Sequence, residues 1–285
     1  MSGLRLGIPE VEYHAHPAFS QSQAKVLLQS PAKYHYRLTH PEPPRDVFDF
    51  GHAVHAKVLG VGLDFDTIDA DSWRTKAAQD ARDASRAAGR VPLLAKDMHA
   101  ADVMAEAVLA HPGARAILET EGDVEASLFW TDADTGVECQ GRHDKLAATA
   151  TGLVNVDLKT TADASLRGFA KSAATYGYHI QAAAYEDGLR HLTGEDCPTV
   201  LIAVEKDAPH LVALYEFPAD ENARGLDKWR DALDALVKYR EADYWPGYPD
   251  SIQPLYLPSW ARKATPRLTP PRRVRSSGAA PAATA

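Results

Sequence analysis

Residues 141–161, GRHDKLAATATGLVNVDLKTT, predict two strands joined by a tight turn. Residues 153–160 alternate in character, as a strand with one buried face does. The pair Thr151-Gly152 marks the turn, because glycine adopts the backbone angles that turns require. The face that we expect to pack on the core carries Val154, Val156 and Leu158. This stretch therefore predicts a pair of antiparallel strands at the centre of the fold.

The other face of the second strand carries a carboxylate and an ammonium group. Asp157 and Lys159 lie two residues apart, so both side chains project from that face. Asp144 precedes Asp157 by 13 residues across the turn, and antiparallel pairing can bring these carboxylates together. Two adjacent carboxylates repel each other, and a divalent cation relieves the repulsion. Oxygen ligands without cysteine favour Mg²⁺ or Mn²⁺ over zinc. On spacing alone, the alternative is a solvated strand face with an ordinary Asp–Lys ion pair.

The neighbouring segments extend this pair into a mixed pattern of helices and strands. Residues 123–130 predict a preceding strand, which makes an antiparallel meander of three, and residues 200–206 and 211–217 predict two more strands. Capping residues predict helix starts near Ser20 and at Ser30-Pro31. Helical spacing predicts further helices over residues 46–60, 72–88, 95–110, 176–192 and 220–242. The order predicts an α+β or mixed α/β fold.

The composition excludes several classes of protein. The chain has 285 residues, 45% of them hydrophobic and 25% charged, which is an ordinary globular mixture. No run approaches the ~18 apolar residues of a membrane span, and the N-terminus lacks the apolar stretch of a secretory signal. Two cysteines cannot supply a disulfide framework or the four ligands of an iron–sulfur cluster. No phosphate-binding glycine loop appears, so no nucleotide cofactor is expected. We expect a cytoplasmic protein with no membrane association.

The charges are distributed unevenly along the chain. Residues 262–285 hold six basic residues and no acidic one, which leaves 25 basic and 39 acidic residues, a net charge of −14, in residues 1–261. A body this acidic does not bind nucleic acid by bulk charge alone. We expect one domain over residues 1–261 and a disordered tail, basic and then rich in alanine and proline, over residues 262–285. An electrostatic tether is the alternative role of the tail.

Several motifs in a fixed order give the sequence a resemblance to a known family. They are GHAVH at 51–55, Glu125, GRHDKL at 141–146, VDLKTT at 156–161 and YGYHIQAAAY at 176–185, after the opening SQSQAKVLLQSPAKY at 20–34. Together they resemble the PD-(D/E)xK nuclease superfamily, specifically its RecB-like exonucleases and most closely the RecE (exonuclease VIII) type domain. The resemblance runs from about residue 13 to residue 217. It implies a restriction-endonuclease-like core, with a central mixed sheet flanked by helices.

The resemblance also implies a role for each motif residue. Asp144 and Asp157 would be metal ligands, with the backbone carbonyl of Leu158 as a third ligand, and Lys159 would be the catalytic lysine. His55 would be a further ligand or a group near the metal, and its alternative is an ordinary core histidine.

Three other motif residues receive less direct roles from the resemblance. Glu125 would be a metal-linked or supporting carboxylate, and its alternative is an exposed strand residue. Gln181 and Tyr185 lie four residues apart, hence on one helix face, which in the family borders the active site and touches DNA or orients the lysine. Ordinary helix packing is the alternative for this pair.

The implied activity is a Mg²⁺-dependent exonuclease, with Mn²⁺ as a substitute, that degrades duplex DNA from its ends for recombination or repair. A single-strand annealing recombination protein and a ring of identical subunits are the partners that the resemblance implies. One alternative is a DNA-binding or recombination-complex module without catalysis, which the acidic body favours. Another is a structure-specific endonuclease on the same scaffold, because both activities use the same metal chemistry.

Overall fold

The computed structural model describes residues 2–40 and 46–258 and divides the chain into two units, Met1–Gly247 and Tyr248–Ala285. Residues 248–258, the described part of the second unit, form neither helix nor strand. The predicted tail at residues 262–285 lies outside the described residues. None of the helices in the described part of the chain has the length and apolar run that crossing a bilayer requires. The first unit contains the predicted strands and helices.

The centre of the first unit is the predicted mixed sheet, and it has seven strands. Its strand order is β1-β5-β6-β7-β8-β9, and β2 pairs with β6 off this path. Neighbours are antiparallel except for the parallel pairs β7–β8 and β2–β6. The strands are β1 (Gly3–Arg5), β2 (Phe19–Ser20), β5 (Gly122–Thr131), β6 (Glu138–Thr149), β7 (Gly152–Thr161), β8 (Thr199–Glu205) and β9 (Val212–Glu216). The predicted meander of three strands is confirmed as β5–β6–β7.

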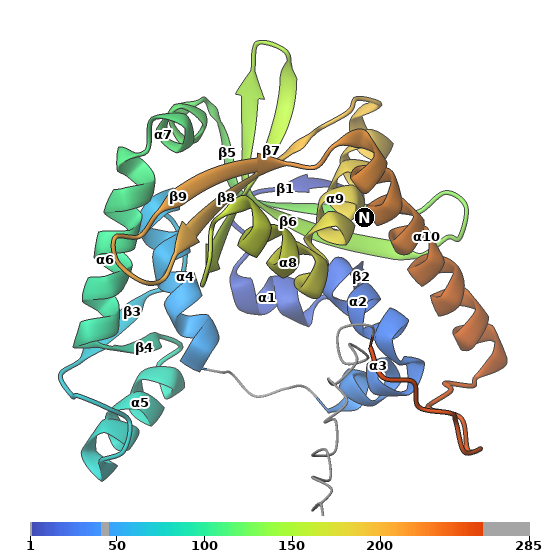
Figure 1. The fold of residues 1–285 in the computed structure, drawn as a ribbon, viewed down its shortest axis with the longest axis horizontal. Coiled ribbons are helices and arrows are strands. Elements are labelled where there is room, and N and C mark those ends of the chain that lie inside the picture. Colours follow the sequence, from blue (N-terminus) through green and yellow to red (C-terminus); the bar gives the residue numbers. More distant parts are fainter. Residues whose placement is uncertain (1, 41–45, 259–285) are drawn as a thin grey trace, which may run out of the picture. The chain divides into compact units, whose positions relative to one another are not determined.

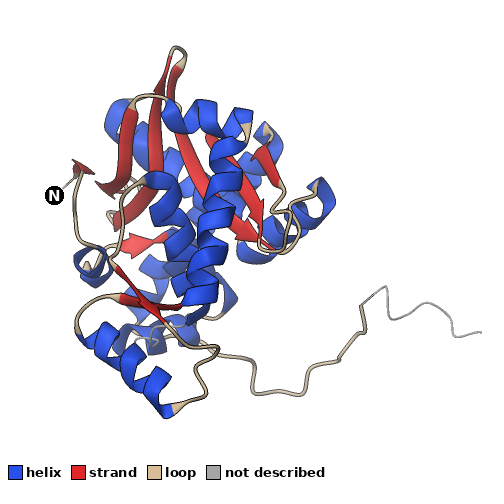
Figure 2. Ribbon diagram, turned by 90° about the vertical axis from the view of Figure 1, so that its left-hand side faces the viewer, coloured by secondary structure: helices blue, strands red, loops and turns tan. Residues whose placement is uncertain are grey.

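Helices cover both faces of this sheet (Figures 1 and 2). One apolar core joins the sheet to α2, α9 and α10, and the other joins it to α4, α6 and α7. The predicted apolar face of β7 packs in the second core, where Val156 and Leu158 are buried. The helices are α1 (Glu10–Ala15), α2 (Gln21–Gln29), α3 (Pro31–Thr39), α4 (Asp46–Leu59), α5 (Lys76–Ala87), α6 (Ala95–Ala110), α7 (Pro112–Glu119), α8 (Leu166–Tyr176), α9 (Tyr178–Thr193) and α10 (Ala219–Ala242).

The predicted helix starts follow from specific caps. Ser20 forms a capping box with Gln23, and the Ser30 hydroxyl accepts from the backbone N–H of Lys33 one turn into α3. The helix expected from residue 72 begins at Lys76 instead, because the Thr75 side chain caps it. A small parallel sheet of β3 (Phe65–Ile68) and β4 (Val91–Leu94), which the sequence pattern did not predict, flanks this helix.

The segment before α9 differs from the prediction. The expected helix over 176–192 begins two residues later, at Tyr178, and a separate helix, α8, ends at Tyr176. Gly177 joins them with φ +65°, a left-handed conformation that glycine adopts without steric strain. The chain therefore turns sharply between two tyrosines, and α9 lies against β5 and β6.

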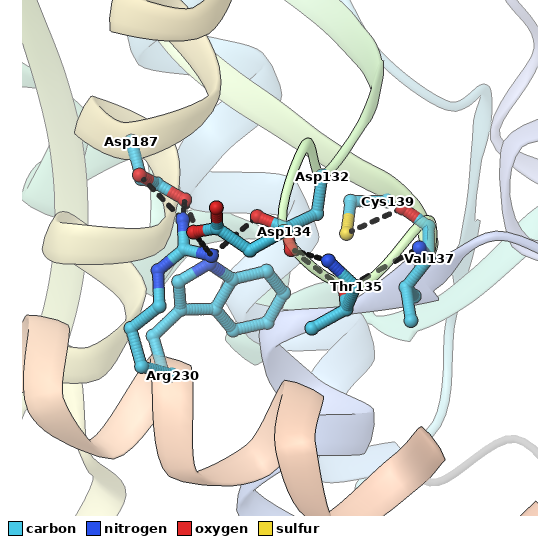
Figure 3. Close-up of polar contacts among 8 residues, drawn as sticks. Asp132, Asp134, Thr135, Val137, Cys139, Asp187 and Arg230 are labelled. Carbon is cyan, nitrogen blue, oxygen red and sulfur yellow. Dashed lines mark hydrogen bonds and ion pairs between the residues drawn. The ribbon is translucent and has the colours of Figure 1, made fainter.

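An arginine on α10 ties that helix to the sheet and to α9 (Figure 3). The Arg230 guanidinium donates to both carboxylate oxygens of Asp187 on α9, at 3.0 and 2.8 Å, and pairs with Asp132 after β5. Asp132 is 2% exposed and also accepts from the backbone N–H of Thr135 at 2.9 Å. The neighbouring Trp229 donates from Nε1 to Asp187 at 3.1 Å. These bonds therefore connect α10 to α9 and to the end of β5.

Candidate functional site

Three carboxylates occupy one row across the central strands. Glu125 lies between two antiparallel pairs of β5 and β6, and its place in the register is opposite Asp144. The pairing of β6 with β7 reaches Lys145 and Val156, so the next position places Asp144 opposite Asp157. The Cβ atoms of directly opposed residues lie about 5 Å apart in antiparallel strands. The register therefore gathers the three acidic residues that the motifs singled out.

Asp144 is held from two sides. The backbone N–H of Leu158 donates to Asp144 Oδ2 at 2.7 Å, where the paired stretch of β6 and β7 ends. His55 Nδ1, from α4, lies 3.3 Å from the same oxygen. Burial raises the pKa of the Asp144 carboxyl, but the charge and hydrogen bond of His55 outweigh burial and lower the pKa overall. Burial likewise lowers the pKa of His55, and Asp144 reverses the shift so that it is raised.

Asp157 is almost inaccessible, at 3% exposure, and has two polar neighbours. Gln181 on α9 donates from Nε2 to Asp157 Oδ1 at 2.7 Å. The Lys159 ammonium forms an ion pair with Oδ2 at 2.6 Å, and no other donor reaches this buried oxygen. Burial and the charge of Asp144 raise the pKa of Asp157 despite the opposing Lys159 ammonium. Burial lowers the pKa of Lys159, but the two aspartates outweigh it and raise that pKa.

Glu125 has a backbone conformation that is uncommon for a residue with a side chain. Its φ is +50°, a region that costs a non-glycine residue about 1–2 kcal/mol. Its carboxylate lies 3.6 Å from Arg142, and burial together with the charge of Asp144 raises its pKa. Strain of this kind persists only where the surroundings fix it, and here Glu125 lines the same cleft as Asp144.

Tyr185 lies on the wall of the site, and burial together with the charges of Asp157 and Asp144 raises its pKa. It is buried, and a Cβ added at Gly141 would meet its ring at 2.7 Å, so β6 needs glycine there. Its ring centre is 4.9 Å from that of His143. Burial lowers the pKa of His143 to about 4, and His143 Nδ1 lies 2.7 Å from Asn155 Oδ1. His143 is thus a neutral core residue beneath the tyrosine.

A cleft of ≈ 480 Å³ opens beside the acids. Its wall includes His55, Glu125, Asp144 and Tyr185, whereas Asp157 and Lys159 do not line it. The sequence analysis did not place several lining residues at the site, namely Glu10, His14, His16, Ser20, Gln21, His52, Gln140 and Arg142. Arg142 is inside the quoted GRHDKL motif, so its charge beside Asp144 was a visible signal. His52 is likewise inside the quoted GHAVH motif. Glu10, His14 and His16 lie in and just after α1, which only the fold brings to this cleft.

The donor atoms at this site suit a hard divalent cation. No three His, Cys, Asp or Glu side chains in the described ranges 2–40 and 46–258 form a ready metal group. The available donors are the carboxylates of Asp144 and Asp157 on neighbouring strands, and one oxygen of the second, Asp157 Oδ2, is buried with the Lys159 ammonium as its polar neighbour. Mg²⁺ is commonly held by one or two carboxylates and keeps several waters, so this donor set fits it better than zinc.

Comparisons with known proteins agree with the fold. A family model described as "PDDEXK-like domain of unknown function (DUF3799)" matches residues 20–256. A solved structure named "Putative exonuclease", from Eubacterium rectale, has a TM-score of 0.62 and 12% sequence identity over 91% of this chain and 99% of that chain. At this identity the likeness shows the fold alone. Another solved structure, SSO0001, has 13% identity over 66% of this chain and 85% of that chain, and its TM-score of 0.29 carries no argument. No curated protein matches the chain.

Proposed function

We propose that this chain, which belongs to the PDDEXK-like family DUF3799, is a Mg²⁺-dependent nuclease that hydrolyses phosphodiester bonds of duplex DNA from an end. The observation that carries the proposal is the cluster of Asp144, Asp157 and Lys159 at the point where β6 and β7 separate. Two acidic side chains from adjacent strands and one strand-mate ammonium form the arrangement that the motifs predicted. Mn²⁺ would substitute for Mg²⁺, because both prefer oxygen donors.

Asp144 and Asp157 would hold the cation, with the Leu158 carbonyl as a third donor. The N–H and C=O of one strand residue point toward the same neighbouring strand, and the Leu158 N–H already bonds Asp144. The Leu158 carbonyl therefore points toward the same acids. A bound Mg²⁺ would supply a polarised phosphate oxygen and a water of lowered pKa.

The remaining side chains position these groups. Lys159 presents a fixed positive charge beside Asp157, where it would orient the attacking water or stabilise the charge that develops on the phosphate. Gln181 holds the Asp157 carboxylate in one orientation through its 2.7 Å bond. His55 does the same for Asp144 from the opposite layer of helices. Glu125 adds negative charge at the cleft side of the row.

The test is a cleavage assay on end-labelled linear duplex and on circular duplex of the same sequence, with Mg²⁺ or EDTA. We expect Mg²⁺-dependent degradation of the linear form only, and loss of activity in Asp157→Asn and Lys159→Ala. Matched controls are Asp80→Asn and Lys76→Ala, which alter an exposed ion pair on α5. Undiminished cleavage in both site variants would refute the assignment. Cleavage of the circle would indicate an endonuclease, and binding without cleavage would indicate a DNA-binding module.

The partners follow from the same proposal. An annealing protein would receive the single strand that the exonuclease exposes. A closed ring of subunits would surround the duplex and offset the repulsion between DNA and the acidic body. Light scattering tests the ring, because a particle of 31.0 kDa would contradict it.

A further inference from the structure

Tyr176 and Tyr178 flank Gly177, the residue between the end of α8 and the start of α9. Tyr176 is 60% exposed, although aromatic side chains usually bury most of their surface. Its ring lies over that of Tyr178, with centres 5.9 Å apart and planes 25° from parallel. The sharp left-handed turn at Gly177 allows this arrangement. One broad face of an aromatic pair is therefore open to solvent.

This pair connects directly to the proposed catalytic lysine. The Lys159 ammonium lies 5.0 Å from the centre of the Tyr178 ring and 2.6 Å from Asp157 Oδ2. The exposed ring of Tyr176 is thus joined to the acids through two successive contacts. A planar group that stacked on the open face of Tyr176 would extend this row of stacked rings, at whose other end lies Lys159.

A second ammonium group adjoins the same turn from α2. Lys25 donates from Nζ to the backbone carbonyl of Tyr176 at 3.0 Å. Its side-chain stem packs against Gly177, where an added Cβ would meet Lys25 Cδ at 2.8 Å. Lys25 makes no ion pair within the described part of the chain. An anion that carries a planar group would place its charge near the Lys25 ammonium and its planar group on the exposed ring of Tyr176.

We propose that Tyr176, Tyr178 and Lys25 form a stacking site for an unpaired nucleotide of the DNA end, next to the phosphodiester that is cleaved. The base stacks on Tyr176, and the phosphate that follows it faces Lys25 and Lys159. Single-stranded nucleic acid is held in this way elsewhere, by aromatic rings combined with cations that track the backbone. The site rests on the proposed function, and it assigns the substrate a frayed or overhanging end.

Binding of a fluorescent 12-nucleotide oligothymidine, measured by anisotropy in EDTA, tests the site without any cleavage. Loss of one stacking ring should weaken binding about five- to a hundredfold, so we expect that loss in Tyr176→Leu. Tyr176→Phe keeps the ring and should bind within about twofold of the unmodified protein. The matched control is Tyr36→Leu on α3, which removes a tyrosine of 61% exposure and should leave binding unchanged.

Three outcomes would overturn the stacking site: no binding by the unmodified protein, unchanged binding in Tyr176→Leu, or an equal loss in Tyr36→Leu. Cleavage of blunt and overhanging duplexes by the same variants separates this failure from failure of the nuclease assignment. If Asp157→Asn is inactive while Tyr176→Leu binds and cleaves normally, only the stacking site is wrong. If Asp157→Asn cleaves normally, the nuclease assignment is wrong whatever Tyr176 does.

Discussion

Gln181 and Asp157, which lie 24 residues apart on α9 and β7, share a 2.7 Å hydrogen bond in which the amide Nε2 donates to the carboxylate Oδ1. Both side chains are at least nine-tenths buried. The bond satisfies one carboxylate oxygen and leaves the other, Oδ2, paired only with the Lys159 ammonium. The helix thereby sets which oxygen of Asp157 is available to a ligand.

Gln181→Leu should lower both the free energy of unfolding and the rate of cleavage. The carboxylate would lose the donor that orients it, which costs about 1–3 kcal/mol of stability when the group stays buried. Loss of orientation should reduce kcat at least about tenfold. Gln181→Glu places a second negative charge against Asp157, so its loss should be larger at low Mg²⁺ and smaller at high Mg²⁺.

Cleavage rates over a Mg²⁺ titration, with urea unfolding of each variant, check both expectations. Gln79→Leu is the control, because Gln79 also donates from Nε2, to the Trp73 carbonyl at 3.0 Å, away from the site. A Gln181→Leu protein with an unchanged kcat would show that the bond does not position Asp157.

Glu125→Gly should stabilise the protein while it lowers activity. Glycine adopts the φ of +50° without steric strain, which should raise the free energy of unfolding by about 1 kcal/mol. The variant loses the carboxylate opposite Asp144, so Mg²⁺-dependent cleavage should fall. Glu125→Gln keeps the strained backbone and removes only the charge, which separates the two effects. Thermal unfolding measures the stability of both variants, and a cleavage assay measures their activity. A Glu125→Gly protein less stable than the unmodified protein would argue against backbone strain at Glu125.

The central strands were predictable because the alternation of polar and apolar residues is visible within a short stretch of sequence. The turn was expected at Thr151-Gly152, but it lies one residue earlier, at residues 150 and 151, and Gly152 pairs with Thr149. The observed register, rather than the expected turn position, places Asp144 opposite Asp157. Alternation does not predict one feature of β6. Cys139 and Leu146 lie in the same core although they are an odd number of residues apart, while the pairing of β6 with β5 keeps one register from Glu138 to Ala147.

Contacts between distant segments were not predictable from periodicity. Lys25 and Tyr176 are 151 residues apart and meet only because α2 and the turn before α9 pack together. The short strands β1 and β2 have three and two residues, too few to show an alternating pattern. The separate helix α8 was missed because its boundary depends on the conformation of Gly177. The roles of the motif residues in metal binding and catalysis stay predictions.

Asp132→Asn should destabilise the protein by about 2 kcal/mol near pH 7, because a buried ion pair with Arg230 is broken. Burial raises the pKa of Asp132, but bonds from Thr135 and Arg230 lower it overall. A carboxyl with a lowered folded pKa contributes stability above its unfolded pKa of 3.8, and this contribution is lost as the pH falls through the folded pKa. The stability gap between the two proteins should therefore narrow below about pH 4.

Urea unfolding at several pH values measures this gap. The matched control is Asp134→Asn, which changes a carboxylate of 85% exposure that lies 3.7 Å from the same guanidinium (Figure 3). An exposed pair contributes little, so this variant should change stability by less than about 0.5 kcal/mol at any pH. A gap for Asp132→Asn that stayed constant down to pH 3 would contradict the assignment.

Lys25 should make oligonucleotide binding weaken as the pH rises. Burial and the nearby Lys159 lower the pKa of Lys25 to about 8, so its positive charge is lost between pH 7 and pH 9. The charged groups that face it are Lys159 and Asp157 on β7, and His179 on α9, whose pKa is lowered by burial. Lys159 keeps its charge over this range because its pKa is raised.

Anisotropy in EDTA at pH 7 and pH 9 provides the test of Lys25. The unmodified protein should lose affinity several-fold, because a cation that faces the phosphate is neutralised. Lys25→Arg stays charged at both pH values, so its affinity should change little. Lys25→Met should bind weakly at both. Equal pH dependence in all three proteins would place the titrating group elsewhere, and Lys25 would then have no part in holding the strand.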